Sequence, residues 1–345
     1  MKKKIVLVGI IIAFCSIMGR ALLFPSTDYM KMTFSEKIQA GYSAHILVNG
    51  DSIGGSVADG EWCTRLVETI EEDLNANVEL NNISKPGNSS IAGIVSWEMM
   101  DKTEQSLTDL VILCYGQNDQ DDSSFEVNYE ALIRNTIRKN PNAEVIAILE
   151  SSQKEYTNKI KTIMKLCDYY DIPYVDMINV FENSGYTYEE LSDDGIHPNT
   201  IGKKIYANAI YNVIKTKLLK KQHFFDFKGE RPQNRSPLNS ASNIYMNFQY
   251  ISLENMDIQN NIVHVEIPED SILGLDLNFI KGNHGITMTL SDGGEKKYVG
   301  YSWEYDAQQR HIYQILSGKH KETKVQLTFS LMGDIENLHG IFYFY

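Results

Sequence analysis

Four short segments of this chain, far apart in sequence, carry residue types that together could cleave an ester. They are Gly50-Asp51-Ser52, Gly87-Asn88, Gly116-Gln117-Asn118-Asp119 and Asp194-Gly195-Ile196-His197. The first three follow apolar runs that predict strands, and the last precedes a helical pattern. Ligands of open α/β sheets collect at the carboxyl ends of the strands. The four segments are therefore candidates for one shared site.

Ser52 is the candidate nucleophile of this site. A serine hydroxyl is a weak nucleophile at neutral pH and needs a base, which a carboxylate must hold in the correct tautomer. Asp194 and His197 supply both groups, and their spacing lets one turn present the carboxylate to one ring nitrogen. Pro198 ends that turn. The sequence thus predicts a Ser-His-Asp triad.

Attack on an ester carbonyl places negative charge on its oxygen, which hydrogen-bond donors must stabilise. We predict an oxyanion hole made of the backbone amides of Ser52 and Gly87 and the side-chain amide of Asn118. Asp51 and Asn88, which adjoin two of these residues, are predicted to contact the substrate.

This pattern resembles the SGNH (GDSL-type) hydrolase superfamily, whose four signature residues match Ser52, Gly87, Asn118 and His197. The resemblance covers roughly Ala44 to Leu219, and Ile53 stands where the family usually has Leu, a change that conserves volume. It implies the roles given above, an ester hydrolase activity, and a flavodoxin-like three-layer fold. It implies no metal or cofactor.

Each segment alone has an ordinary interpretation as a turn or a helix cap, and their joint occurrence in this order favours catalysis. Other candidate sites are weaker. Cys63, Cys114 and Cys167 lack zinc-binding spacing and are interpreted as buried thiols. The acidic run Asp119 to Asp122 is interpreted as a solvated loop, although it could bind a cation or shape the substrate rim.

Composition and the N-terminus indicate where this chemistry takes place. The formal net charge of −13 argues against a nucleic-acid partner. Residues 1–24 hold three lysines and then an apolar run, which is typical of a signal peptide or of an uncleaved membrane anchor. We expect an exported protein at the cell surface, either anchored in the membrane or secreted.

Residues 40–220 alternate strand and helix patterns and predict an α/β domain with a parallel sheet. The expected strands are Ile46–Val48, Val78–Ile83, Leu110–Cys114, Val145–Leu149 and Pro173–Val175. The expected helices are Glu61–Leu74, Tyr129–Lys139, Lys154–Tyr170 and one from Asn199 or Thr200 to about Leu219. Residues 184–191 are a candidate specificity loop.

Residues 221–243 are polar and predict a linker, and residues 244–345 predict a small all-β sandwich or jelly roll. The expected strands are Ile262–Ile267, Gly285–Leu290, Lys297–Tyr301, His311–Leu316, Lys324–Leu331 and Gly340–Tyr345, with a hairpin turn at Asp292-Gly293-Gly294. The aromatic residues of this region are expected mostly in the sandwich core. Trp303 is the best candidate for a sugar-binding platform, which would make the domain carbohydrate-binding.

Three functions fit the sequence. The first is an extracellular serine esterase that removes small acyl groups, foremost O-acetyl, from a glycan. The second is an O-acyltransferase that uses the same site to modify a surface polysaccharide, since site residues do not separate transfer from hydrolysis. The third is a non-catalytic glycan-binding or assembly protein on the same scaffold, against which the full set of catalytic residue types counts.

Overall fold

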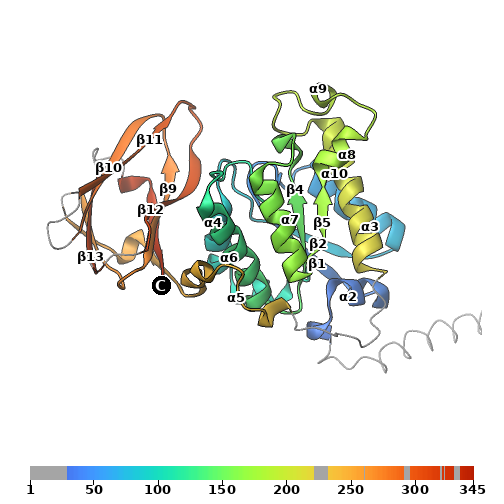
Figure 1. The fold of residues 1–345 in the computed structure, drawn as a ribbon, viewed down its shortest axis with the longest axis horizontal. Helices are drawn as coiled ribbons and strands as arrows, with labels where there is room; N and C mark the ends of the chain where they lie inside the picture. The colour runs from blue at the N-terminus through green and yellow to red at the C-terminus, as the bar shows by residue number, and fades with distance from the viewer. Residues whose placement is uncertain are drawn as a thin grey trace, which may run out of the picture.

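The computed structural model describes residues 29–220, 232–259, 261–290, 296–318, 321, 323–329 and 335–345. The predicted N-terminal signal or anchor, residues 221–231 of the predicted linker and the predicted turn at residues 292–294 lie outside the described residues. Figure 1 shows two lobes, an α/β lobe and a smaller β lobe. Within the described ranges, no helix is both long enough and apolar enough to cross a membrane.

The α/β lobe is built on a five-stranded parallel sheet, here called sheet A, with strand order β2-β1-β3-β4-β5. Its strands are β1 (Ala44–Gly50), β2 (Val78–Asn82), β3 (Leu110–Cys114), β4 (Glu144–Leu149) and β5 (Tyr174–Asp176). This is the flavodoxin-like order. The predicted parallel α/β fold is confirmed.

Helices cover both faces of sheet A. One face packs on α4 (Ser90–Met99), α6 (Ser123–Lys139) and α7 (Asn158–Tyr170). The other packs on α2 (Phe34–Ala40), α3 (Trp62–Leu74), α8 (Met177–Glu182) and α10 (Thr200–Val213). Two short helices complete the lobe, α5 (Lys102–Leu107) and α9 (Tyr188–Leu191), and Leu191 of α9 joins the second core. Successive strand residues serve opposite faces, so that Val111 joins the first core and Ile112 the second.

Helix ends differ from the predicted ones where side chains cap them. Helix α7 begins at Asn158 rather than Lys154, because Lys154 has a left-handed backbone (φ 58°) and Thr157 caps the helix. Helix α6 begins earlier than expected, since the Asp122 side chain accepts a hydrogen bond from the Ser124 amide. The last predicted helix ends its α-helical part at Val213, and a π-helical turn, η3 (Ile214–Leu218), follows.

The β lobe is a sandwich of two antiparallel sheets, as predicted. Sheet B has the order β12-β9-β14-β6 and sheet C the order β11-β10-β13-β8-β7. The strands are β6 (Phe248–Ser252), β7 (Asp257–Gln259), β8 (Ile262–Glu266), β9 (Ile272–Phe279), β10 (Gly282–Leu290), β11 (Lys296–Trp303), β12 (Gln309–Leu316), β13 (Lys324–Phe329) and β14 (Leu338–Phe344). Aliphatic side chains such as Leu275, Leu327 and Ile341 fill its core.

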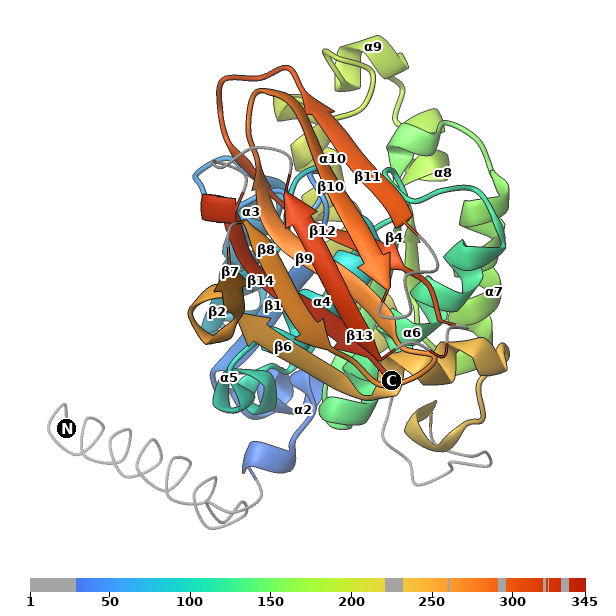
Figure 2. The same cartoon turned by 90° about the vertical axis from the view of Figure 1, so that its left-hand side faces the viewer.

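The two lobes share a hydrophobic core, because the outer face of sheet B packs on the α/β lobe (Figure 1). Figure 2 is viewed from the side of the β lobe and shows its sheets in front of the α/β lobe. Ile272, Ile312, Phe342 and Phe344 of sheet B belong to the same buried cluster as α4 and α6. Residues 240–246 form a 3₁₀ helix, η5, whose Tyr245 hydroxyl donates to the Asn128 side chain on α6 at 2.6 Å. The C-terminal end of the predicted linker is therefore packed against α6.

Candidate active site

Ser52, His197 and Asp194 form a continuous hydrogen-bonded relay. Ser52 follows the carboxyl end of β1, and the other two lie in the loop between α9 and α10. Ser52 Oγ lies 2.8 Å from His197 Nε2, and His197 Nδ1 lies 2.6 Å from Asp194 Oδ2. We assign the Nδ1–H tautomer from these partners. His197 Nε2 is thus free to accept the Ser52 hydroxyl proton.

The Asp194 carboxylate is stabilised in its ionised form. Its pKa is lowered below 3.8, chiefly by the hydrogen bond from the His197 side chain and then by the amides of His197 and Ile196. Those amides donate to Asp194 Oδ1 at 2.8 and 2.9 Å. Asn199 caps α10 directly after this loop by accepting from the amides of Ile201 and Gly202. The carboxylate and the cap hold the imidazole in place.

The three predicted oxyanion donors follow three neighbouring strands of sheet A. In the part of the chain that the structure describes, the backbone amides of Ser52 and Gly87 have no hydrogen-bond acceptor. Asn118 Nδ2 lies 3.1 Å from the Asn88 carbonyl oxygen and 3.2 Å from Asp51 Oδ2. An amide nitrogen carries two hydrogens, so an oxyanion would share a hydrogen of Asn118 with one of these acceptors.

Side chains of α7 and of the start of α4 bind the loop that carries Asn118 by hydrogen bonds. Lys159 on α7, a buried side chain, donates to the carbonyls of Gly116 and Asp119. The Asp119 carboxylate accepts from the Ser90 amide and, at 2.6 Å, from the Ser90 hydroxyl at the start of α4. Asp119 is therefore not the solvated loop residue that the sequence predicted: it is buried and ties this loop to α4.

Residues 48–205 match the GDSL-like Lipase/Acylhydrolase family. The chain carries a GDSL-like lipase/acylhydrolase domain. It is a carboxylic ester hydrolase. No curated protein matches the chain.

Among solved structures, the GDSL-like domain and the β lobe together are similar to a two-domain esterase (CEX) active on acetylated mannans, co-crystallised with mannopentaose. The TM-score is 0.69 at 16% identity, over 89% of this chain and 92% of that one. The acetyl xylan esterase AlAXEase is similar over 49% of this chain and 99% of its own, with a TM-score of 0.42 and 20% identity. The first comparison shows that the two-lobed fold has a solved counterpart.

Three buried acidic groups cluster next to Ser52, the predicted nucleophile. Asp51, Cys114 and Glu150 are fully buried, and their side-chain ligand atoms lie within 4.8 Å of one another. Burial raises the pKa of both carboxyls, and their mutual repulsion raises that of Glu150 further. Burial also raises the pKa of the Cys114 thiol. These groups could ligate a metal only in their ionised forms, and burial favours the protonated form of each.

Two residues predicted to contact the substrate have structural partners instead. Asp51 has no exposed surface and accepts from the amide of Ile53 at 2.8 Å and from Asn118. Asn88 is 2% exposed, and its side chain bonds to the backbone of β12. The structure thus places neither of these predicted side chains at the surface.

The edges of the β lobe that adjoin the GDSL-like domain carry a ladder of stacked rings. His284, Tyr301, Phe279 and His311 follow one another with centroids 4.8, 3.9 and 3.9 Å apart. A Cβ built on Gly87 would lie 2.8 Å from His311 Cε1. Trp303, half-buried, lies edge-on to His311 with a centroid distance of 5.5 Å. The predicted sugar platform therefore lies one ring away from the loop of Gly87.

The expectation that the aromatic residues of this region lie mostly in the sandwich core is met in part: Phe329 is buried there, and Phe279 and Tyr301 pack against it. Tyr298, Tyr305 and Tyr313 are exposed. The core is filled by branched aliphatic side chains, which pack between two sheets without a polar tip that needs a partner. The exposed rings remain available for contact with a ligand.

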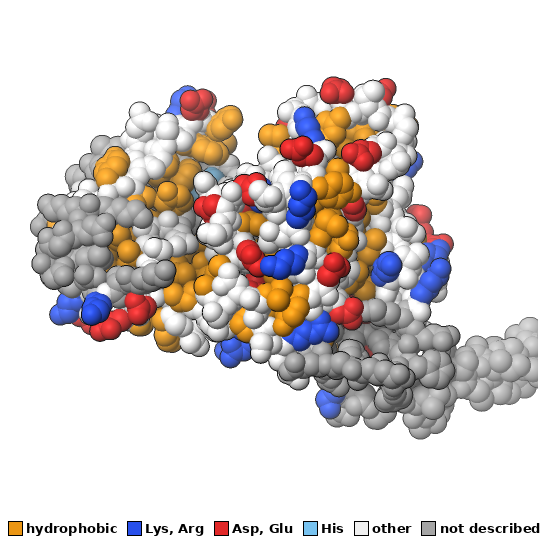
Figure 3. Space-filling model, in the orientation of Figure 1, with side chains coloured by type: hydrophobic (Ala, Val, Ile, Leu, Met, Phe, Trp, Pro, Cys, Tyr) orange, Lys and Arg blue, Asp and Glu red, His pale blue; other side chains and the backbone are white. Residues whose placement is uncertain are grey.

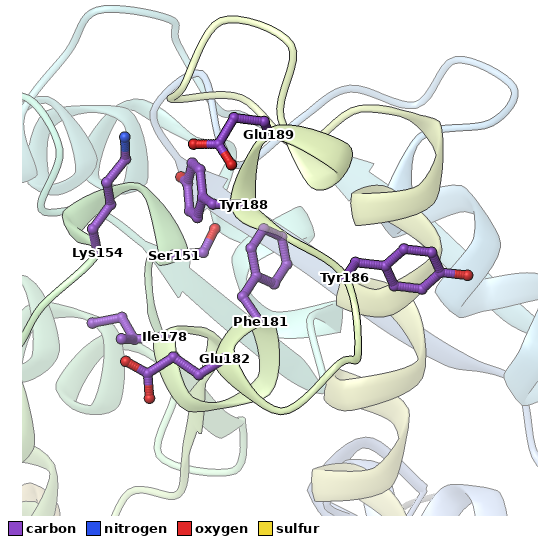
Figure 4. Close-up of a pocket in the computed structure, with 8 residues that line it drawn as sticks. All are labelled: Ser151, Lys154, Ile178, Phe181, Glu182, Tyr186, Tyr188 and Glu189. Atoms are coloured by element: carbon purple, nitrogen blue, oxygen red, sulfur yellow. The ribbon is translucent and has the colours of Figure 1, made fainter.

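The space between the lobes is hollowed. Figure 3 shows a hollow open between the β lobe and the part of the GDSL-like domain that carries α9, with hydrophobic side chains on part of its β-lobe wall. A separate pocket of about 290 Å³ includes Tyr186, Tyr188 and Glu189 of the candidate specificity loop in its lining (Figure 4). Lys154 in this pocket lies 4.5 Å from the Tyr188 ring centroid, and a Cβ on Gly195 would lie 3.6 Å from its Nζ. The pocket thus adjoins the loop of the relay.

Proposed function

We propose that the protein is an extracellular esterase that removes small acyl groups, foremost acetyl, from the hydroxyls of a glycan. The observation that carries the catalytic part is the relay from Asp194 through His197 to Ser52, which ends beside unpartnered amide donors. No metal or cofactor takes part in this mechanism.

In the proposed reaction, Ser52 Oγ attacks the ester carbonyl carbon while His197 Nε2 takes the hydroxyl proton. The carbonyl oxygen becomes negative and accepts hydrogen bonds from the amides of Ser52 and Gly87 and from Asn118. The C–O bond to the sugar then breaks, and His197 returns the proton to the leaving sugar oxygen. Water activated by His197 attacks the acyl-enzyme and releases the carboxylic acid and free Ser52.

A glycan substrate is supported by the rings beside the site. Trp303 contacts His311, which lies beside Gly87, and aromatic faces with polar edges suit sugar rings. The two-domain fold is that of an esterase active on acetylated mannans. We extend acetyl removal from a glycan to this chain on these two grounds. The extracellular location rests on the lysine-rich, apolar segment of residues 1–24.

The test is release of acetate from acetylated mannan and acetylated xylan by the purified chain, with Ser52→Ala as the control. We expect acetate from at least one glycan and none with Ser52→Ala. Turnover of para-nitrophenyl acetate without release from any acetylated glycan would retain the esterase and contradict the glycan substrate.

A further inference from the structure

The β lobe contacts the loop from Pro86 to Asn88 through the buried side-chain amide of Asn88. Strand β12 lies at the edge of sheet B, so none of the described strands pairs with its outer side. The Asn88 side chain occupies that edge: its Nδ2 donates to the Arg310 carbonyl at 3.0 Å, and its Oδ1 accepts from the Ile312 amide at 2.8 Å. These two bonds reproduce the pairing that a further strand would make.

The same residue also fixes an oxyanion donor. The Asn88 backbone carbonyl accepts from Asn118 Nδ2 at 3.1 Å, and Asn118 comes from the opposite side of the site. The preceding residue, Gly87, has a left-handed backbone with φ 72°. Its amide is a predicted oxyanion donor too. The position of Asn88 therefore sets the position of two donors at once.

Strand β12 makes further contacts with this loop. The Gln309 side chain donates to the Pro86 carbonyl, and the Asn88 side chain donates to the same oxygen at 2.9 Å. The His311 ring lies so close to Gly87 that an added Cβ would overlap its Cε1. The loop from Pro86 to Asn88 is thus held between β12 and the rest of the GDSL-like domain.

We infer that Asn88 is a positioning residue through which the β lobe completes the oxyanion hole, so that the two lobes form one catalytic unit. Arg310 and Ile312 hold the Asn88 side chain, and Asn88 in turn holds Asn118 and the Gly87 amide in place. Asn88 does not contact the substrate and acts through those two donors. This inference rests on the oxyanion roles given under Proposed function.

The test compares two buried asparagines that join the lobes in the full chain. Asn88→Asp keeps the shape but removes the hydrogens donated to Arg310 and Pro86. Asn135→Asp is the matched control. Asn135 lies on α6, and its Nδ2 donates to the Tyr245 carbonyl of η5, away from the loop of Gly87. Each variant is assayed with para-nitrophenyl acetate, and its folding is followed by thermal unfolding.

We expect Asn88→Asp to lower kcat about 10- to 100-fold with KM changed less than about twofold, since only the transition state forms the oxyanion. Asn135→Asp should lower the thermal midpoint while keeping kcat within about twofold of the parent. Equal kcat in Asn88→Asp and the parent would overturn the inference. So would an equal loss of kcat in Asn135→Asp, since any weakened contact between lobes would then suffice.

A second variant covers the case in which Asn88→Asp does not fold. Gln309→Ala removes a bond from β12 to Pro86 from a partly exposed side chain. It should lower kcat about three- to tenfold with KM unchanged, and an unchanged kcat would contradict the inference. A parent chain that releases no acetate from glycans would contradict the proposed glycan substrate alone, because these ratios are measured on para-nitrophenyl acetate.

Discussion

At the scale of single residues, the chemistry depends on how two sets of carboxyl groups are kept in different protonation states. Asp194 lies in the half-exposed relay and has a lowered pKa. Asp51 and Glu150 are buried and have raised pKa values. The ionised form is thus favoured for Asp194, which orients His197, and the protonated form is favoured for the two buried carboxyls.

Replacement of Asp194 should remove most of the activity. Asp194→Asn no longer offers two acceptor oxygens to His197, so the ring loses its preferred tautomer and its charge partner. We expect kcat for para-nitrophenyl acetate to fall about 10²- to 10⁴-fold. Asp193→Asn, one position earlier, is the matched control and should keep kcat within about threefold. Similar losses of kcat in the two variants would contradict the relay, because they would show that any change in this loop impairs catalysis.

Glu150 should make the stability of the fold depend on pH. Its pKa is raised above its ordinary value of 4.5, so its contribution to the free energy of unfolding is complete below that pH and is lost as pH rises through the folded-state pKa. Glu150→Gln cannot ionise and should gain stability relative to the parent from about pH 4.5 upward. Denaturant unfolding at several pH values measures this difference. Glu72→Gln, at an exposed position, is the control for the loss of one negative charge, and a difference for Glu150→Gln that does not change with pH would contradict the assignment.

At the scale of elements, the site is assembled from loops that follow neighbouring parallel strands. Ser52 follows β1, Gly87 follows β2 and Asn118 follows β3. The chain could supply these residues from segments far apart because the carboxyl ends of parallel strands meet at one edge. The same geometry makes the loop of Gly87 sensitive to what packs on it.

Gly87→Ala should impair catalysis for a steric and a conformational reason. Its φ of 72° is unfavourable for alanine, and the new Cβ would lie 2.8 Å from His311 Cε1. We expect kcat to fall about 10- to 100-fold. Gly87→Ala combined with His311→Ala should recover part of the loss, because the clash is relieved while the backbone strain remains. A double variant no better than Gly87→Ala would show that the His311 contact is not limiting.

The sequence predicts the relay well and its supports poorly. Residue type and order suffice to place Ser52, Gly87 and Asn118 after three strands, and His197 in the turn before a helix. The sequence predicts that Asn88 contacts the substrate. It does not predict the partners that the structure shows, because they lie in β12, more than two hundred residues away. Nothing local to either segment indicates that contact.

Elements buried on both sides were also harder to predict. Helix α4 packs between sheet A and the β lobe, and eight of its ten residues are buried, so it lacks the polar face that marks a surface helix. Strand β9 is central in sheet B and is buried on both faces for most of its length. It therefore lacks the alternation by which the other long strands were found. Strands β6 and β7, which are short, were missed as well.

At the scale of the whole molecule, the shared core predicts that the lobes unfold together. Ile312, Phe342 and Phe344 of sheet B pack in one cluster with α4 and α6. Phe342→Ala should destabilise the chain by about 3–5 kcal/mol, because it empties a fully buried site. Calorimetry should show one transition that moves as a unit to lower temperature. Two transitions, of which only one moves, would show that the lobes are thermodynamically independent.

The central claim is that Ser52 carries the acyl group during turnover. The most direct measurement is mass spectrometry of the intact chain and its peptides, quenched with acid during turnover of para-nitrophenyl acetate. We predict one acetyl group per chain on the peptide that contains Ser52, and none in Ser52→Ala, which should also be inactive. An acetyl group on another residue during active turnover, or full activity in Ser52→Ala, would contradict the account.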